Sequence, residues 1–196
     1  ATILDRLTKN AVRMQIPIGE EENHEGVVDL LKMKGYLFEG DMGNLVKEIE
    51  VPENLKAAAT KFRAELVDKI VAEDDALMGD YLEGKEISIP DLKKTLRKAT
   101  IANKIVPVFC GSALKNKGVQ LVLDGVIDYL PSPMDIPPVK GFDPNTNEEL
   151  TRHADDSEPF TALAFKLQAD PFVGQLTFFR IYSGTIEAGS YVYNAT

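Results

Sequence analysis

The sequence predicts an α/β chain that is followed by the first strands of an antiparallel β domain. Residues 105–109 form a short apolar run before a loop and an amphipathic helix at 119–130, which is the strand–loop–helix order of an α/β sheet. Residues 53–72 place apolar side chains on one stripe of a long helix. From Thr161 onward the apolar residues alternate with a period of two, which is typical of strands.

The N-terminal part is predicted to be mostly β. Residues 2–9 have helical spacing, and residues 11–18 alternate in a way that predicts one continuous strand. Three further short strands are predicted at 27–31, 35–38 and 46–51.

Helices are predicted in the next part of the chain. Pro52 and Glu53 suit the first turn of a helix that runs to residue 72. A shorter helix is expected at 75–83, with Gly84 ending it, and a third begins at Ser88, a typical N-cap.

The C-terminal part begins with prolines. These end the helix at 119–130 and hold residues 131–138 extended, and residues 141–158 are polar and predict a loop. Strands are expected at 161–167 and 176–182, and another begins at 191–193.

Composition excludes several classes of protein. The chain has 196 residues, 22 Lys and Arg and 31 Asp and Glu, so its net charge of −9 argues against nucleic-acid binding by bulk charge. No apolar run is long enough to span a membrane, and no signal peptide is recognisable. Because Cys110 is the only cysteine, it forms no internal disulfide, which fits the reducing cytoplasm.

Several candidate sites have a plain structural explanation. Residues 79–86 come close to a phosphate-binding loop, but Glu86 stands where a hydroxyl is needed, which favours a helix end at Gly84. His24 and His153 lack zinc spacing and are predicted to be solvated loop residues.

Cys110 also has two interpretations. A buried cysteine at a strand end is the expectation, and a hydrolase with Cys110 as its nucleophile is the alternative.

The loop at 111–118 is the strongest candidate for a ligand site. It follows a predicted buried strand, where ligands of open α/β sheets bind, and its small residues allow close backbone approach. It also lies in the one stretch without an acid surplus, 101–140, which holds Lys104, Lys115, Lys117 and Lys140. This small surplus is a weak sign of an anion site and is more often a solvated face. An ordinary strand-to-helix loop explains the same spacing.

Three stretches together resemble the translational GTPases of the elongation factor G family. Residues 105–133 resemble the fifth guanine-nucleotide motif and the last helix of the GTPase domain. Residues 15–34 resemble the start of the insertion between the fourth and fifth motifs, and residues 170–184 the first hairpin of the second domain.

The resemblance implies a domain organisation. Residues 1–15 and 104–130 correspond to the C-terminal part of a P-loop-type GTPase domain, and residues 16–103 to an inserted α+β subdomain. Residues 131–158 correspond to a Pro-rich linker and polar loop, and residues 159–196 to the first strands of an antiparallel β-barrel.

The resemblance also implies a nucleotide site. The backbone N–H of Ala113 contacts the guanine carbonyl, Ser112 shapes the loop and Leu114 lines the base. The phosphate-binding loop, Asp-x-x-Gly and Asn-Lys-x-Asp motifs are missing, and in the family they precede residue 1. We therefore expect a fragment that hydrolyses no GTP and binds GDP weakly or not at all, whereas the intact protein uses GTP or GDP with magnesium.

Partners follow from the same resemblance. They are the ribosome, including its stalk protein through the inserted subdomain, and tRNA and mRNA through domains outside this chain, with no membrane. The charged helix residues of the insertion serve the stalk contact or are merely solvated: Lys56, Lys61, Glu65, Asp68 and Lys69. The alternatives are a related ribosomal GTPase, such as a release factor or ribosome-protection protein, and a stand-alone binding module.

Overall fold

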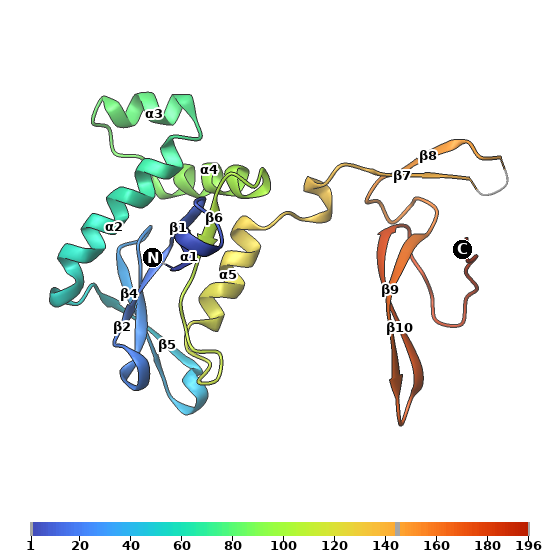
Figure 1. Cartoon of the computed structure of the whole chain (residues 1–196), viewed down its shortest axis with the longest axis horizontal. Coiled ribbons are helices and arrows are strands. Elements are labelled where there is room, and N and C mark those ends of the chain that lie inside the picture. The colour runs from blue at the N-terminus through green and yellow to red at the C-terminus, as the bar shows by residue number, and fades with distance from the viewer. Residues whose placement is uncertain (1, 144–145, 196) are drawn as a thin grey trace. The chain divides into compact units, whose positions relative to one another are not determined.

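The computed structural model describes residues 2–143 and 146–195 and divides into two units, Ala1–Leu130 and Pro131–Thr196 (Figure 1). Each unit has its own strands, and the α-helices of the described residues belong to the first. Within those residues no helix has the length and apolarity needed to cross a membrane.

The first unit begins with a helix and two short strands in place of the single strand predicted at 11–18. These are α1 (Thr2–Arg6), β1 (Ala11–Arg13) and β2 (Gln15–Ile18). The prediction was wrong at Met14, where the chain passes from one sheet to another. The Met14 N–H donates to the Val108 carbonyl and its own carbonyl accepts from the Leu30 N–H, both at 3.0 Å. The alternation of apolar residues continues from β1 into β2 although the pairing partner changes, because both strands contain buried side chains.

A four-stranded antiparallel sheet has the order β2-β3-β4-β5. The strands that follow β2 are β3 (Gly26–Asp29), β4 (Lys34–Glu39) and β5 (Leu45–Glu50), within three residues of their predicted ends. Two 3-10 turns, η1 (Glu21–Asn23) and η2 (Asp41–Gly43), connect β2 to β3 and β4 to β5. Since adjacent strands are antiparallel, both turns lie at the same end of the sheet (Figure 1).

The three predicted helices are confirmed as α2 (Glu53–Val71), α3 (Asp75–Leu82) and α4 (Ile89–Ile101). Ser88 caps α4 by accepting a hydrogen bond from the Asp91 N–H. Gly84 follows the end of α3 with a φ of +77°, the left-handed conformation that glycine adopts after a helix. The near-match to a phosphate-binding loop is therefore a helix end.

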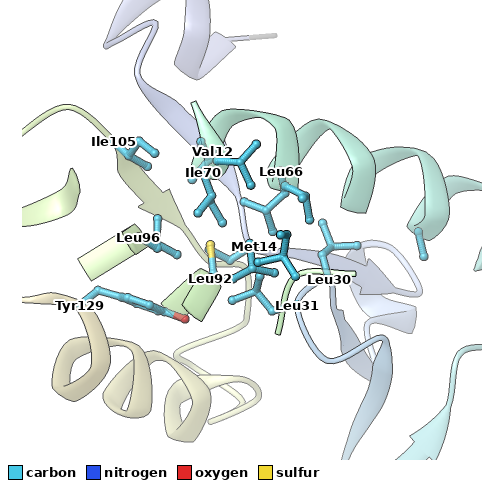
Figure 2. Close-up of a cluster of buried hydrophobic side chains, with 14 of the residues drawn as sticks. Val12, Met14, Leu30, Leu31, Leu66, Ile70, Leu92, Leu96, Ile105 and Tyr129 are labelled. Carbon is cyan, nitrogen blue, oxygen red and sulfur yellow. The ribbon is translucent and has the colours of Figure 1, made fainter. Parts of the chain in front are cut away.

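The larger of two hydrophobic clusters joins most elements of the first unit. Val12, Ile105 and Tyr129 pack in the same cluster as Leu66 of α2 and Leu96 of α4 (Figure 2). The regions expected to be the end of a GTPase domain and its insertion thus share side-chain contacts. Burial of this continuous apolar cluster provides the main stabilisation of the unit.

The sheet is buried on both faces at β3. Val28 belongs to the main core, and Val27, on the opposite face, packs with Tyr36 and Phe38 in a second cluster. Both valines are fully buried. Leu121 packs against this second cluster, so residues following the 111–118 loop cover the face turned away from the main core.

The run at 105–109 is less buried than predicted. Its strand, β6 (Val106–Val108), pairs in parallel with β1 and, among the described strands, with no other. Ile105 is buried, but Val106 is 41% exposed. Helix α5 (Val119–Tyr129) is confirmed and likewise exposes apolar side chains, including Leu123 and Ile127.

The second unit consists of two hairpins. They are formed by β7 (Val139–Phe142) with β8 (Glu149–Arg152), and by β9 (Thr161–Asp170) with β10 (Gly174–Ser183). A short 3-10 turn, η3 (Pro133–Asp135), precedes them.

Two sequence predictions fail in the second unit. The polar loop predicted at 141–158 overlaps the β7–β8 hairpin, which an ion pair between Lys140 and Glu149 bridges at 2.9 Å. Its strands are largely exposed, so they lack the apolar alternation that marks a half-buried strand. Residues 191–193 form no strand, and Tyr191 is fully exposed because nothing in the described part of the chain pairs with it.

Candidate functional site

The candidate site is a closed loop between β6 and α5. The backbones of Ser112 and Lys117 pair through two hydrogen bonds, of 2.8 and 2.9 Å, and the Asn116 N–H donates to the Ala113 carbonyl at 3.1 Å. Asn116 and Gly118 have positive φ values of +50° and +89°, which let the chain reverse within a few residues. The loop is therefore held by its own backbone.

The three predicted nucleotide contacts occupy different positions in this loop. The Ser112 N–H donates to the Lys117 carbonyl and so helps to close the loop. Ala113 and Leu114 lie at the exposed tip, where Leu114 is 86% exposed. Within the described residues their N–H groups donate to nothing, so both are available to a ligand.

Two glycines make the neck of the loop narrow. A Cβ at Gly111 would lie 2.5 Å from the Lys117 carbonyl oxygen, and one at Gly118 would lie 2.9 Å from that of Cys110. Side chains at these positions collide with backbone, which cannot move aside. The small residues noted in the sequence thus serve the loop's own closure, besides leaving its tip accessible.

The four-stranded sheet supports the loop. The Lys117 ammonium donates to the His24 carbonyl at 2.8 Å, and the Gln120 amide donates to the Gly43 carbonyl at 3.1 Å. Lys115 makes a longer contact, 3.4 Å, with the Glu22 carbonyl. The two lysines that weakly suggested an anion site therefore bind backbone carbonyls. These contacts join residues 77 and 93 positions apart, and no local sequence signal predicts them.

His24 was predicted to be solvated and is instead buried, with 8% of its surface exposed. Its acidic sequence neighbours suggested an open loop, but Lys117 and the site loop pack against it. Burial, reinforced by the charges of Lys117 and Lys115, lowers the pKa of His24, although a backbone hydrogen bond at Gly19 opposes the shift. Its Nε2 has no hydrogen-bond partner among the described residues. His153 is exposed, as predicted.

Cys110 lies at the base of the loop, half-buried, with its N–H donating to the Gln15 side chain at 3.3 Å. Burial raises the pKa of its thiol to about 11. A nucleophilic cysteine needs a lowered pKa, so this environment argues against the hydrolase alternative. Within the described part of the chain, no cluster of His, Cys, Asp or Glu side chains is arranged to hold a metal ion.

Some charged side chains of α2 bind other groups of this same chain. The Lys69 ammonium donates to the Ala11 carbonyl at 3.2 Å, and Asp68 accepts from the Tyr81 hydroxyl at 2.5 Å. Lys56 pairs with Glu53. Of the five charged residues singled out in the sequence, Lys61 and Glu65 remain exposed without a partner in the described structure.

Two hollows lie elsewhere on the molecule. One of about 370 Å³ in the second unit is lined by prolines of the linker together with Arg152, Arg180 and Tyr182. Another, of about 490 Å³, lies beside Arg63, whose guanidinium binds the Leu30 and Leu31 carbonyls. Neither hollow includes residues 112–114.

Comparison with known proteins shows what one segment is similar to. Residues 159–196 match the family described as elongation factor G domain 2. The likeness to this family is thus limited to the C-terminal part of the second unit. The match includes the β9–β10 hairpin, whose turn is fixed by Asp170 accepting from the Phe172 and Val173 N–H groups.

A structural comparison extends over most of the chain. A crystal structure of a protein from Thermus thermophilus matches with a TM-score of 0.69 and 27% sequence identity. The match covers 92% of this chain but only 24% of that protein, so the chain spans about a quarter of the length of its structural relative. Together the comparisons support a fragment of the translation-elongation-factor type.

Proposed function

We propose that this chain is part of a translation elongation factor of the G type, which uses GTP binding and hydrolysis to move tRNA and mRNA through the ribosome. The observation that carries the proposal is the domain 2 match at residues 159–196. The structural likeness supports it as well, because the match covers 92% of the chain and so includes residues of both units.

Within that protein, the loop at 111–118 binds the guanine base. The Ala113 N–H donates to the guanine carbonyl oxygen, Leu114 lies along the base, and Ser112 holds the loop closed. The free N–H groups at the tip and the narrow glycine neck support this role. Small side chains suit recognition by backbone N–H groups, because they leave the peptide group accessible to the ligand.

Phosphate and magnesium binding belongs to other parts of the protein. No Gly-x-x-x-x-Gly-Lys-Ser/Thr sequence is present here, and hydrolysis requires groups that position phosphates and the metal. The 196-residue chain alone therefore hydrolyses no GTP and binds fluorescent GDP more weakly than the micromolar range. Titration giving micromolar or tighter affinity contradicts this assignment.

Ala113 allows a direct test in the full-length protein that contains this chain. Ala113→Pro removes the N–H, whereas Ala113→Gly retains it. We expect GDP but not ADP to displace a fluorescent guanine nucleotide from wild-type protein. The proline variant should lose most of this affinity, and the glycine variant should keep it. Equal competition by ADP, or equal affinity of both variants, contradicts guanine recognition by this loop.

The inserted region is proposed to contact the ribosomal stalk protein through the exposed charges of α2. Lys61→Glu with Glu65→Lys reverses charges that have no partner in the described structure, so the fold should be unaffected. Weaker binding of purified stalk protein supports the proposed contact, and unchanged binding contradicts it. Lys94→Glu, which reverses one charge at an exposed lysine of α4, serves as a control.

A further inference from the structure

We propose that the two 3-10 turns of the four-stranded sheet act as a clamp that positions the base-binding loop, with Lys117 and Gln120 as the positioning residues. The turn clamp is defined here as residues 21–24 and 41–43 with the side chains of Lys117 and Gln120. The inference rests on the proposed guanine-binding role of the loop and adds a means of controlling it.

The topology brings the clamp together. Turns η1 and η2 lie at one end of the sheet, and the loop before α5 lies at that same end (Figure 1). Lys117 fastens the loop to the first turn through the His24 carbonyl, and Gln120 fastens the start of α5 to the second through the Gly43 carbonyl. The loop is thus held from two turns that lie at the same end of the sheet and are separate in sequence.

The second turn also touches the loop backbone. Gly43 is buried with a φ of +62°, and a Cβ there would lie 3.0 Å from the Asn116 carbonyl oxygen and 3.2 Å from that of Lys115. Turn and loop therefore pack without a side chain between them. A shift of the turn is transmitted directly to residues 115–116, which follow the base-contacting tip.

The junction is partly buried. His24 is 8% exposed, and its Nε2 and the Gln120 Oε1 atom are buried without a hydrogen-bond partner in the described structure. A charged donor such as the Lys117 ammonium makes a stronger hydrogen bond than a neutral donor such as the Gln120 amide. The hydrogen bond of Lys117 is accordingly the stronger of the two, and that of Gln120 the weaker.

The clamp makes nucleotide affinity depend on the sheet. A partner that moves either turn changes the geometry of Ser112–Leu114 without touching the nucleotide. By linkage, nucleotide binding then changes that partner's affinity by the same factor. The proposed guanine site is thus coupled to the surface of the inserted region through a pair of identified hydrogen bonds.

The test uses the full-length protein with three variants. Lys117→Met removes the ammonium but keeps the aliphatic chain, Lys117→Arg restores a charged donor, and Lys94→Met makes the same change at an exposed site away from the loop. GDP dissociation is measured by chasing a bound fluorescent analogue. Lys117→Met should release GDP roughly tenfold faster, as expected for loss of a charged hydrogen bond. Both Lys94→Met and Lys117→Arg should stay within about twofold of wild type.

Hydrogen exchange provides a readout that needs no nucleotide. In Lys117→Met the amides of Ser112 and Asn116 should exchange faster, while helix α2 keeps its protection and the melting temperature is nearly unchanged. A uniform loss of protection indicates general destabilisation and overturns the clamp, as does unchanged GDP release. If wild-type protein binds no GDP, the proposed function fails and the clamp's nucleotide role fails with it. Faster exchange confined to the loop then still identifies Lys117 as the residue that holds the loop in place.

Discussion

Replacing Leu96 with alanine tests the claim that residues 16–103 and the rest of the first unit share the main hydrophobic cluster. Leu96 is fully buried on α4 in the cluster that includes Ile105 and Tyr129 on one side and Ile70 on the other (Figure 2). Its side chain thus joins elements at both ends of the unit. A cavity at this position weakens packing across the whole of residues 1–130.

The size of the effect follows from the burial. Leucine-to-alanine changes in cores cost about 2–5 kcal/mol, and the larger values belong to enclosed sites that do not collapse. Because Leu96 has no exposed surface, we expect about 3–4 kcal/mol. For a domain with a stability of roughly 5–15 kcal/mol, this lowers the melting temperature by about 10–20 °C.

Far-UV circular dichroism at 222 nm is the suitable assay, since the α-helices of the described residues lie in the first unit. Urea titrations compare wild type, Leu96→Ala and Leu82→Ala, the last at a helical leucine that is 78% exposed. The control should lose less than about 0.5 kcal/mol. Equal losses in both variants, or separate transitions for residues 16–103 and the rest of the unit, refute the shared core.

Three further results are expected. Because burial and the nearby Lys117 and Lys115 lower the pKa of His24, the unfolded chain binds its proton more readily. Stability is then complete above about pH 6.5 and falls as the pH decreases below it; urea midpoints at pH 7.5 and 5.5 should differ less in His24→Gln than in wild type. Cys110, with its pKa raised to about 11, should react with iodoacetamide at pH 8 roughly 100-fold more slowly in the folded chain than in urea, and comparable rates contradict its burial. Gly111→Ala should cost about 1–3 kcal/mol, since its Cβ meets the Lys117 carbonyl; an unchanged urea midpoint rejects the narrow neck.

Local chemistry made the helices predictable. Ser88 as an N-cap, Gly84 after a helix and the apolar stripe of 53–72 each act over a few residues, and all three are present in the structure. The strand at 11–18 was mispredicted because its alternation does not reveal that Met14 changes partners. The β7–β8 hairpin was missed because exposed strands need no apolar face.

The candidate site was predictable only in position. The order of strand, small-residue loop and amphipathic helix pointed to residues 111–118, and the structure shows free N–H groups at their tip. The burial of His24 and the partners of Lys117 and Gln120 arise from contacts between distant parts of the chain. Charge counting gave Lys117 only as a weak sign of an anion site or as part of a solvated face, because sequence does not show which carbonyls lie within reach.

Advance of mRNA on ribosomes is the most direct test of the central claim, that this chain belongs to a G-type elongation factor. The full-length protein is added with GTP to ribosomes that carry tRNA in the pre-translocation state, and mRNA position is recorded. We predict an advance by one codon that requires GTP and is slowed in Ala113→Pro but not in Ala113→Gly. Tight, specific GDP binding without any advance, or peptide release in its place, contradicts the account and points to another ribosomal GTPase.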